Sequence, residues 1–174
     1  MSNLKIIIAP DPRLLKVSKP VENVDKKIKT ILDDMLEIMY KSNGIGLAAP
    51  QVGILKRLVV MDCSGQNIKK KPFKLVNPEI LNFSSEKIEF EEGCLSLPTQ
   101  QAKVVRPGDI QIQYKDENGI KIQKCFSGIE AICLQHEIDH LDGKLFVDHI
   151  SKLKKNRIIK KLEKIKKSNL YNER

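Results

Sequence analysis

The sequence predicts an α+β fold, in which mostly antiparallel strands are combined with three helices, the last of them basic. Apolar residues recur at helical spacing over residues 26–42 and again over about 127–141. Between these segments, residues 110–122 alternate between apolar and polar side chains on both sides of Asn118-Gly119, which is typical of a β-hairpin. Further short strands are expected at residues 57–62, 73–76 and 87–90.

The first two predicted helices are bounded by residues that favour helix ends. Asp25 is a candidate N-cap for the first helix, and the Asn-Gly pair at 43–44 ends it. Ser127 and Glu130 match the S-x-x-E capping box at the start of the second helix, and Gly143 ends that helix.

Length and composition indicate one globular domain over residues 1–174. The chain has a mass of 19.8 kDa, with 41% hydrophobic and 30% charged residues, which excludes disordered and fibrous proteins. No apolar run approaches the roughly 20 residues that a membrane-spanning helix needs. We therefore expect no membrane span, signal peptide or membrane partner.

Most of the net charge of +9 lies at the C-terminal end. Residues 152–174 hold ten Lys or Arg and two Glu, whereas the first 151 residues hold 21 basic and 20 acidic residues. Ser151 is a candidate N-cap for a basic helix over about residues 151–168, in which Ile158, Leu162 and Ile165 form a narrow apolar stripe. Such a segment is typical either of docking onto a polyanion or of a solvated helix face.

The four cysteines, Cys63, Cys94, Cys125 and Cys133, form no C-x-x-C pair and follow no secretory signal. Reduced thiols in a cytoplasmic protein are therefore expected. The lysine-rich segment Gln66–Pro72 reads as an exposed loop.

The strongest local signal is the segment His136-Glu137-Ile138-Asp139-His140 in the second helix. Residues four apart share a helix face, so two imidazoles can bind one metal ion. Glu137 follows the first of them and can act as general base toward a water at such a site. The alternative is a chance match on a surface helix.

A catalytic site of this kind needs a third protein ligand and an open position. The metzincin pattern fails, because Phe146 stands where its last histidine should be, and Glu163 lies among lysines of the basic segment. Cys133 is seven residues from His140, or roughly 10 Å along a helix, which is too far. His149, after the helix, remains open as a ligand.

Two upstream segments carry further candidates. In Glu92–Pro98, Gly93 allows a sharp bend beside Cys94, although such a cysteine is also typical of simple packing. In Gly44–Gly53, small residues allow an extended peptide to approach the backbone, and Gln51 offers an amide donor. A tight structural loop is the alternative there.

Taken in order, these three segments resemble the signature motifs of peptide deformylase: G-I-G-L-A-A-P-Q, E-G-C-L-S-L-P and Q-H-E-I-D-H. The similarity extends over essentially the whole chain, from Pro10-Asp11 through the basic helix. It implies an α+β enzyme with mostly antiparallel sheets around a central metal-binding helix. It also implies a bacterial class of the family that has a long C-terminal helix.

The resemblance implies that Cys94, His136 and His140 bind one divalent metal ion, which in this family is typically Fe²⁺, with Ni²⁺, Co²⁺ or Zn²⁺ as substitutes. It implies hydrolysis of the N-formyl group of formylmethionyl nascent peptides, with release of formate and with Glu137 as general base. The Gln51 side chain and the backbone N–H of Leu95 would stabilise the oxyanion.

The implied substrate is extended along the backbone near residues 44–46. The matching pocket positions are Gly44, Ile45, Gly46, Phe90, Glu92, Ile129, Ile132 and Cys133. For Ile129 and Ile132, core packing is the alternative. Gln101 replaces an arginine that many relatives carry, which puts the preference beyond methionine in doubt. Asp139 is expected to make structural contacts.

The resemblance also gives the basic helix a partner, the ribosome beside its exit tunnel. Two other functions compete with this interpretation. A general metallopeptidase would cleave unformylated peptides, and a structural metal module would need a fourth protein ligand, for which His149 is the candidate.

Overall fold

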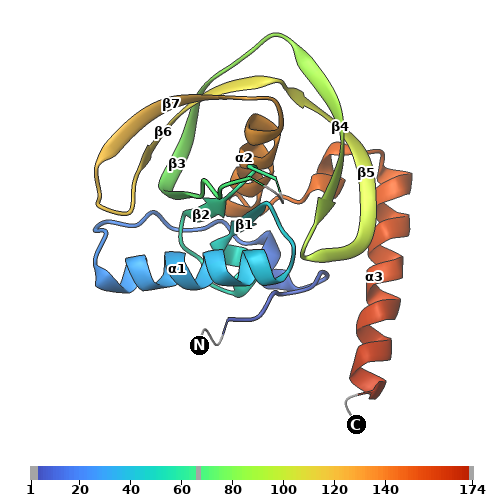
Figure 1. Cartoon of the computed structure of the whole chain (residues 1–174). Helices are drawn as coiled ribbons and strands as arrows, with labels where there is room; N and C mark the ends of the chain where they lie inside the picture. The colour runs from blue at the N-terminus through green and yellow to red at the C-terminus, as the bar shows by residue number, and fades with distance from the viewer. Residues whose placement is uncertain (1–3, 66–67, 173–174) are drawn as a thin grey trace.

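The computed structural model describes residues 4–65 and 68–172 and has the expected α+β architecture (Figure 1). Its three α-helices are α1 (Lys26–Lys41), α2 (Gly128–Leu141) and α3 (Lys152–Asn172). Its seven strands are β1 (Gly46–Ala48), β2 (Leu58–Met61), β3 (Phe73–Phe83), β4 (Lys87–Cys94), β5 (Leu97–Pro107), β6 (Asp109–Lys115) and β7 (Lys121–Ser127). Three short 3₁₀ helices, η1 (Pro12–Leu15), η2 (Ala49–Val52) and η3 (Phe146–His149), lie in the connections.

The strands form two antiparallel sheets. The larger has the order β1-β2-β3-β6-β7, and the smaller is the β4-β5 hairpin. The predicted hairpin at 110–122 is confirmed as β6-β7, in which Asp109 pairs with Ser127 and Lys115 with Lys121. Gly119 in its turn has a φ of 80°, a conformation that glycine adopts without strain.

Helix α2 lies in the centre of the molecule, between the larger sheet and the β4-β5 hairpin (Figure 1). It is buried around most of its circumference, and Ala131, Leu134 and Leu141 have no exposed surface. One apolar cluster joins these residues to Val59 and Met61 of β2. Each functional side chain of α2 is therefore held on a helix with little freedom to move.

Helix α1 covers the opposite side of β2, as the alternation of strand side chains requires. Leu32, Met35 and Met39 are fully buried against Leu58 and Val60. The predicted N-cap is confirmed, because the N–H of Ile28 donates to the Asp25 side chain at 2.8 Å.

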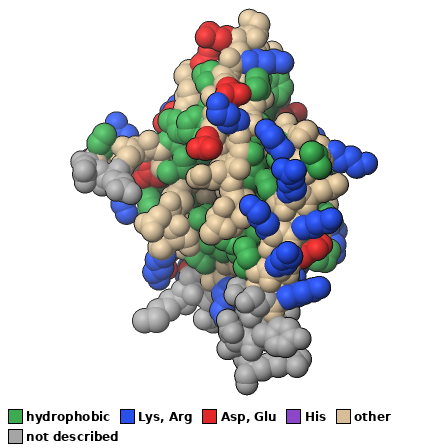
Figure 2. Space-filling model, turned by 90° about the vertical axis from the view of Figure 1, so that its right-hand side faces the viewer, with side chains coloured by type: hydrophobic (Ala, Val, Ile, Leu, Met, Phe, Trp, Pro, Cys, Tyr) green, Lys and Arg blue, Asp and Glu red, His purple; other side chains and the backbone are tan. Residues whose placement is uncertain are grey.

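Helix α3 packs on the molecule through the predicted stripe. Ile158 is 9% exposed and Leu162 is fully buried, in a cluster with β5 and η3 that Ile165 also contacts. The basic side chains of its described part mostly face outward, and Figure 2 shows lysine and arginine gathered on this side of the molecule. Among the described residues, no helix combines the length and apolar character needed to cross a membrane.

The structure differs from the expected local elements at several places. Residues 97–107, for which the sequence predicted no element, form the long strand β5. Strand β1 occupies part of the segment 44–53, for which a tight loop was the alternative interpretation. The strand expected at 73–76 continues to Phe83. Ser127 is the N-cap of α2, but its side chain makes no capping hydrogen bond, so the capping box with Glu130 does not form. Of the expected loop 66–72, Gln66 and Asn67 lie outside the described residues, and 68–72 are exposed.

Candidate active site

Three metal-binding side chains converge beside the centre of α2. One donor atom from each of Cys94, His136 and His140 lies within 4.8 Å of the other two. Cys94 is the last residue of β4, at the hairpin turn, where its Sγ is 3.2 Å from Nε2 of His140. His136 and His140 reach the same point from successive turns of α2.

The chemistry of this group fits a divalent metal ion. One thiolate and two imidazoles suit several first-row metals, and three protein ligands leave a position open, as in catalytic sites. Buried Nδ1 of His140 has no hydrogen-bond partner among the described residues. Burial also lowers the pKa of His140 well below its ordinary value, which keeps the ring neutral as a ligand must be.

His149 does not belong to this group. Its Nε2 lies 2.7 Å from Oδ2 of Asp139, and the metal-binding group in the described part of the chain contains neither residue. The interpretation that left His149 open as a ligand is therefore wrong. Asp139 makes the structural contacts expected of it, because the same oxygen also accepts from Nη1 of Arg106 at 2.8 Å.

Glu92 orients the first histidine. Its Oε2 lies 2.8 Å from Nδ1 of His136, which leaves Nε2 of that ring toward the metal position. Burial alone would raise the pKa of Glu92, but hydrogen bonds from His136 and Arg106 outweigh it and lower the pKa. The resemblance implies that Glu92 is a pocket position, and Glu92 does line the cavity. Its carboxylate, however, makes its contacts with His136 and Arg106.

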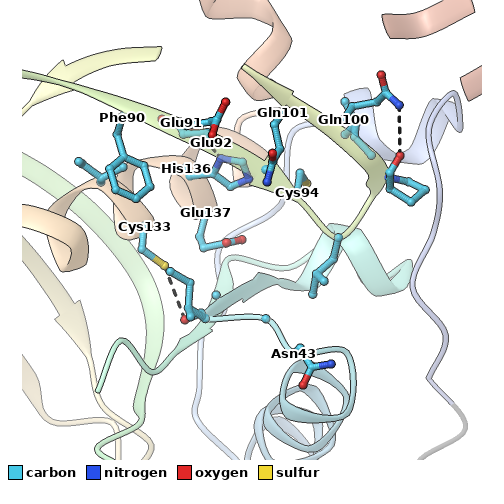
Figure 3. A pocket seen from close by; sticks show the side chains of 18 of the residues that line it. Asn43, Phe90, Glu91, Glu92, Cys94, Gln100, Gln101, Cys133, His136 and Glu137 are labelled. Atoms are coloured by element: carbon cyan, nitrogen blue, oxygen red, sulfur yellow. Dashed lines mark hydrogen bonds and ion pairs between the residues drawn. The ribbon is translucent and has the colours of Figure 1, made fainter. Parts of the chain in front are cut away.

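Glu137 points into the site from α2 (Figure 3). It is 4% exposed, and its Oε2 has no hydrogen-bond partner among the described residues. Burial raises the pKa of this carboxyl to about 7. A carboxyl with such a pKa can both take up and return a proton near neutral pH.

Gln51 is held with its amide nitrogen toward the site. The N–H of Ala48 donates to Oε1 of Gln51 at 2.7 Å, which fixes the amide orientation. The Nε2 then lies 3.5 Å from Sγ of Cys94. Gln51 is 1% exposed, so this donor is preorganised and shielded from bulk water.

A cavity of about 660 Å³ opens in front of these groups (Figure 3). Among the residues lining it are Gly44, Ile45, Gly46, Gln51, Phe90, Glu92, Cys94, Leu95, Ile129, Ile132, Cys133, His136 and Glu137, all expected at the site. His140, which is 1% exposed, is not part of this lining. Ile129 is 37% exposed and Phe90 39%, so both large apolar side chains are accessible from the cavity that they line. Ile132 is 3% exposed, so it serves the core and the cavity wall together.

Sequence reasoning missed part of the lining and a buried partner. The additional lining residues are Asn43, Glu91, Gly93, Leu97, Pro98, Thr99 and Gln100, most of them from the β4-β5 hairpin. Gln101, which the sequence had linked to substrate preference, also lines the cavity. Arg106 is 5% exposed and pairs with Glu92. Arg106 lies in β5, 14 residues from Glu92 in the sequence, so its pairing with Glu92 could be predicted only once the β4-β5 hairpin was known.

Comparison with known proteins decides the family. The sequence profile described as "Polypeptide deformylase" matches residues 3–156. The chain belongs to this family. A peptide deformylase of Pelagibacter ubique is 48% identical over 170 residues, covering 98% of this chain and 99% of that protein. One from Rhizobium meliloti is 47% identical over 163 residues, covering 94% of each.

Solved deformylase structures share the fold. The enzyme of Ehrlichia chaffeensis in complex with actinonin has a TM-score of 0.88 at 43% identity, covering 94% of this chain and 98% of that one. The enzyme of Legionella pneumophila also has a TM-score of 0.88, at 44% identity, covering 96% of this chain and 97% of that one. Deformylases are metal-dependent hydrolases that remove the N-formyl group from new polypeptides, and this chain is an enzyme of that kind.

Proposed function

We propose that this chain deformylates N-formylmethionyl nascent peptides with Glu137 as its proton-transferring residue and with Cys94, His136 and His140 as metal ligands. The observation that carries the proposal is the buried carboxyl of Glu137, whose Oε2 has no hydrogen-bond partner among the described residues and which lines a cavity beside three converging donors. A bound divalent metal ion would supply Lewis-acid activation of water and of the formyl carbonyl.

The protein groups then divide the proton transfers and the charge stabilisation. Glu137 takes a proton from the attacking water and later gives it to the leaving amine, so that formate and a free N-terminus are released. The Gln51 amide and the backbone N–H of Leu95 donate to the carbonyl oxygen as negative charge develops there. The fixed orientation of Gln51, through Ala48, supports this role.

The methionine side chain would occupy the apolar part of the cavity. Phe90, Ile129 and Cys133 line it from two elements, β4 and α2, and Ile45 is 45% exposed at its edge. The substrate backbone would lie along Gly44–Gly46, where two of the three residues are glycines and leave room for it. The actinonin complex of the similar Ehrlichia chaffeensis enzyme supports ligand binding on this fold.

Fe²⁺ is the metal ion we propose for the native enzyme, with Ni²⁺, Co²⁺ or Zn²⁺ able to substitute. The thiolate and imidazole donors are compatible with all four. Metal analysis of protein purified without oxygen from its natural source checks this assignment. Zinc as the main ion there would contradict it.

Formate release tests the catalytic roles. The wild-type chain and Glu137→Ala are loaded with iron or nickel without oxygen and given a formyl-Met tripeptide. We expect release by the wild type only, with equal metal content in both. Release by the variant would contradict the role of Glu137. The unformylated peptide is the control, and its cleavage would favour a general metallopeptidase.

The same proposal gives α3 a partner and the chain a location. One catalytic domain over residues 1–174 would act in the cytoplasm, docked by α3 on ribosomal RNA near the exit tunnel. Exposed basic side chains of α3 support the docking, including Lys154, Arg157 and Lys161. Neutralising these three should reduce ribosome co-sedimentation without affecting hydrolysis of a short formyl peptide. Equal co-sedimentation would refute the docking.

A further inference from the structure

Two cysteines outside the metal-binding group, Cys63 and Cys133, face the interface between α2 and the larger sheet. Cys133 of α2 is 6% exposed and lines the cavity, while Cys63 follows β2 and is half-buried. Cys133 belongs to the apolar cluster between α2 and the larger sheet, and Cys63 packs against that cluster. Neither thiol binds the metal or transfers a proton in the hydrolysis described above, although Cys133 lines the proposed methionine pocket.

The backbone around the two thiols is held by one shared acceptor. The carbonyl of Ile45 accepts the N–H of Asp62 at 2.8 Å, and it also accepts the thiol of Cys133 at 3.6 Å (Figure 3). Asp62 directly precedes Cys63. The β1-β2 pairing, in which Gly46 faces Met61, keeps this end of β2 against α2. The two cysteines are therefore juxtaposed by regular structure.

We propose that Cys63 and Cys133 are a dithiol site that a low-molecular-weight disulfide such as oxidised glutathione converts to an intramolecular disulfide. In the first step the Cys63 sulfur attacks one sulfur of the small disulfide, forming a mixed disulfide and releasing one small thiol. In the second, the Cys133 sulfur attacks the Cys63 sulfur and releases the other. The chain loses two electrons and two protons, and the small disulfide gains them.

The surroundings favour this order of attack. Interaction with the Cys133 thiol lowers the pKa of Cys63, whereas interaction with Cys63 together with burial raises the pKa of Cys133. Cys63 is also the more exposed thiol of the two. It is therefore the thiol that meets a dissolved oxidant first, and Cys133 is the thiol that resolves the intermediate.

A disulfide between Cys63 and Cys133 would change the surroundings of Ile45 and Gly46, along which the substrate backbone is proposed to lie. The Cys133 sulfur lies against Gly46, only 2.6 Å from where a Cβ on that residue would stand, and it donates to Ile45. A disulfide removes that donor and ties α2 to the end of β2. This consequence rests on the proposed function, and we expect a several-fold higher KM for a formyl-Met tripeptide, reversed by dithiothreitol. The formation of the bond does not depend on the proposed function.

Peptide mapping tests the bond separately from activity. Nickel-loaded full-length chain is equilibrated with oxidised glutathione, alkylated and digested with trypsin. Trypsin leaves Cys125 and Cys133 on one peptide, residues 125–144, so the Cys125→Ser variant assigns the bond. We expect residues 58–69 linked to residues 125–144 in the wild type and in Cys125→Ser, but not in Cys63→Ser.

The outcomes are distinct. A persistent glutathione adduct on Cys63, or bonds only through Cys94 or Cys125, would overturn the proposal. A Cys63–Cys133 bond with an unchanged KM would overturn its effect on substrate binding. Absence of formate release from the reduced wild type would contradict the proposed function, whatever the mapping finds.

Discussion

Arg106 forms a buried ion pair with Glu92, the residue that orients the metal-binding His136. Nε of Arg106 is 2.5 Å from Oε1 of Glu92, and the two side chains are 5% and 3% exposed. The pair links β5 to β4 where the strands flank α2. A metal ligand on a helix is thus held in place by a charge pair on the neighbouring hairpin.

Arg106→Met should destabilise the protein strongly. It leaves the Glu92 carboxylate buried without its cation, and breaking one side of a buried pair costs about 3–5 kcal/mol. Urea unfolding of the metal-loaded protein measures the loss. Lys103→Met is the matched control, because it removes an exposed ion pair with Glu89 on the same hairpin. If both variants unfold at the same urea concentration, the buried pair is not stabilising in the way we infer.

Glu92→Gln should weaken metal binding and should also lower stability, because it leaves Arg106 with only Asp139 as a charged partner. The amide keeps the side-chain volume, but it accepts less strongly from Nδ1 of His136, so the ring is a poorer and less well oriented ligand. Loss of such an outer contact typically costs about 10- to 100-fold in metal affinity. Competition with a chelator measures the affinity, and circular dichroism verifies the fold. An affinity equal to that of the wild type would contradict this role.

The sequence predicted what depends on local pattern. The H-E-I-D-H segment places both imidazoles on one face because four residues make about one helical turn. The stripe of Ile158 and Leu162 likewise follows from helical spacing. These features need no knowledge of distant contacts.

The β4-β5 hairpin could not be predicted in this way. Residues 97–107 begin and end near prolines and show no clear alternation, and their buried Leu97 and Val104 pack on η3 and α3, about 40 to 60 residues later. Because β5 was missed, Arg106 had no visible partner. The same hairpin supplies most of the cavity lining that sequence reasoning overlooked.

Gly46→Ala should disturb the packing of β1 against Glu137 and Cys133 of α2, and so the proposed site of the substrate backbone. An added Cβ would stand 2.5 Å from Oε1 of Glu137 and 2.6 Å from Sγ of Cys133, and both neighbours are buried. Overpacking of this kind typically costs about 1–3 kcal/mol. We expect a lower melting temperature and a large fall in kcat/KM for a formyl-Met tripeptide. Gly93→Ala is the control for stability, since its Cβ would meet its nearest neighbour at 3.5 Å. Equal melting temperatures for the two variants would refute the close contact.

Substitution of Gln51 separates its structural role from its chemical one. Gln51→Ala removes both the acceptor for the Ala48 N–H and the donor near Cys94, whereas Gln51→Glu keeps the acceptor and replaces only the donor. Loss of one oxyanion donor typically lowers kcat by about 10²–10³. If Gln51 acts as proposed, both variants should lose kcat to this extent, and Gln51→Glu should keep the metal. Near-normal turnover by Gln51→Glu would mean that the amide serves only to hold η2, because the acceptor alone would then be sufficient.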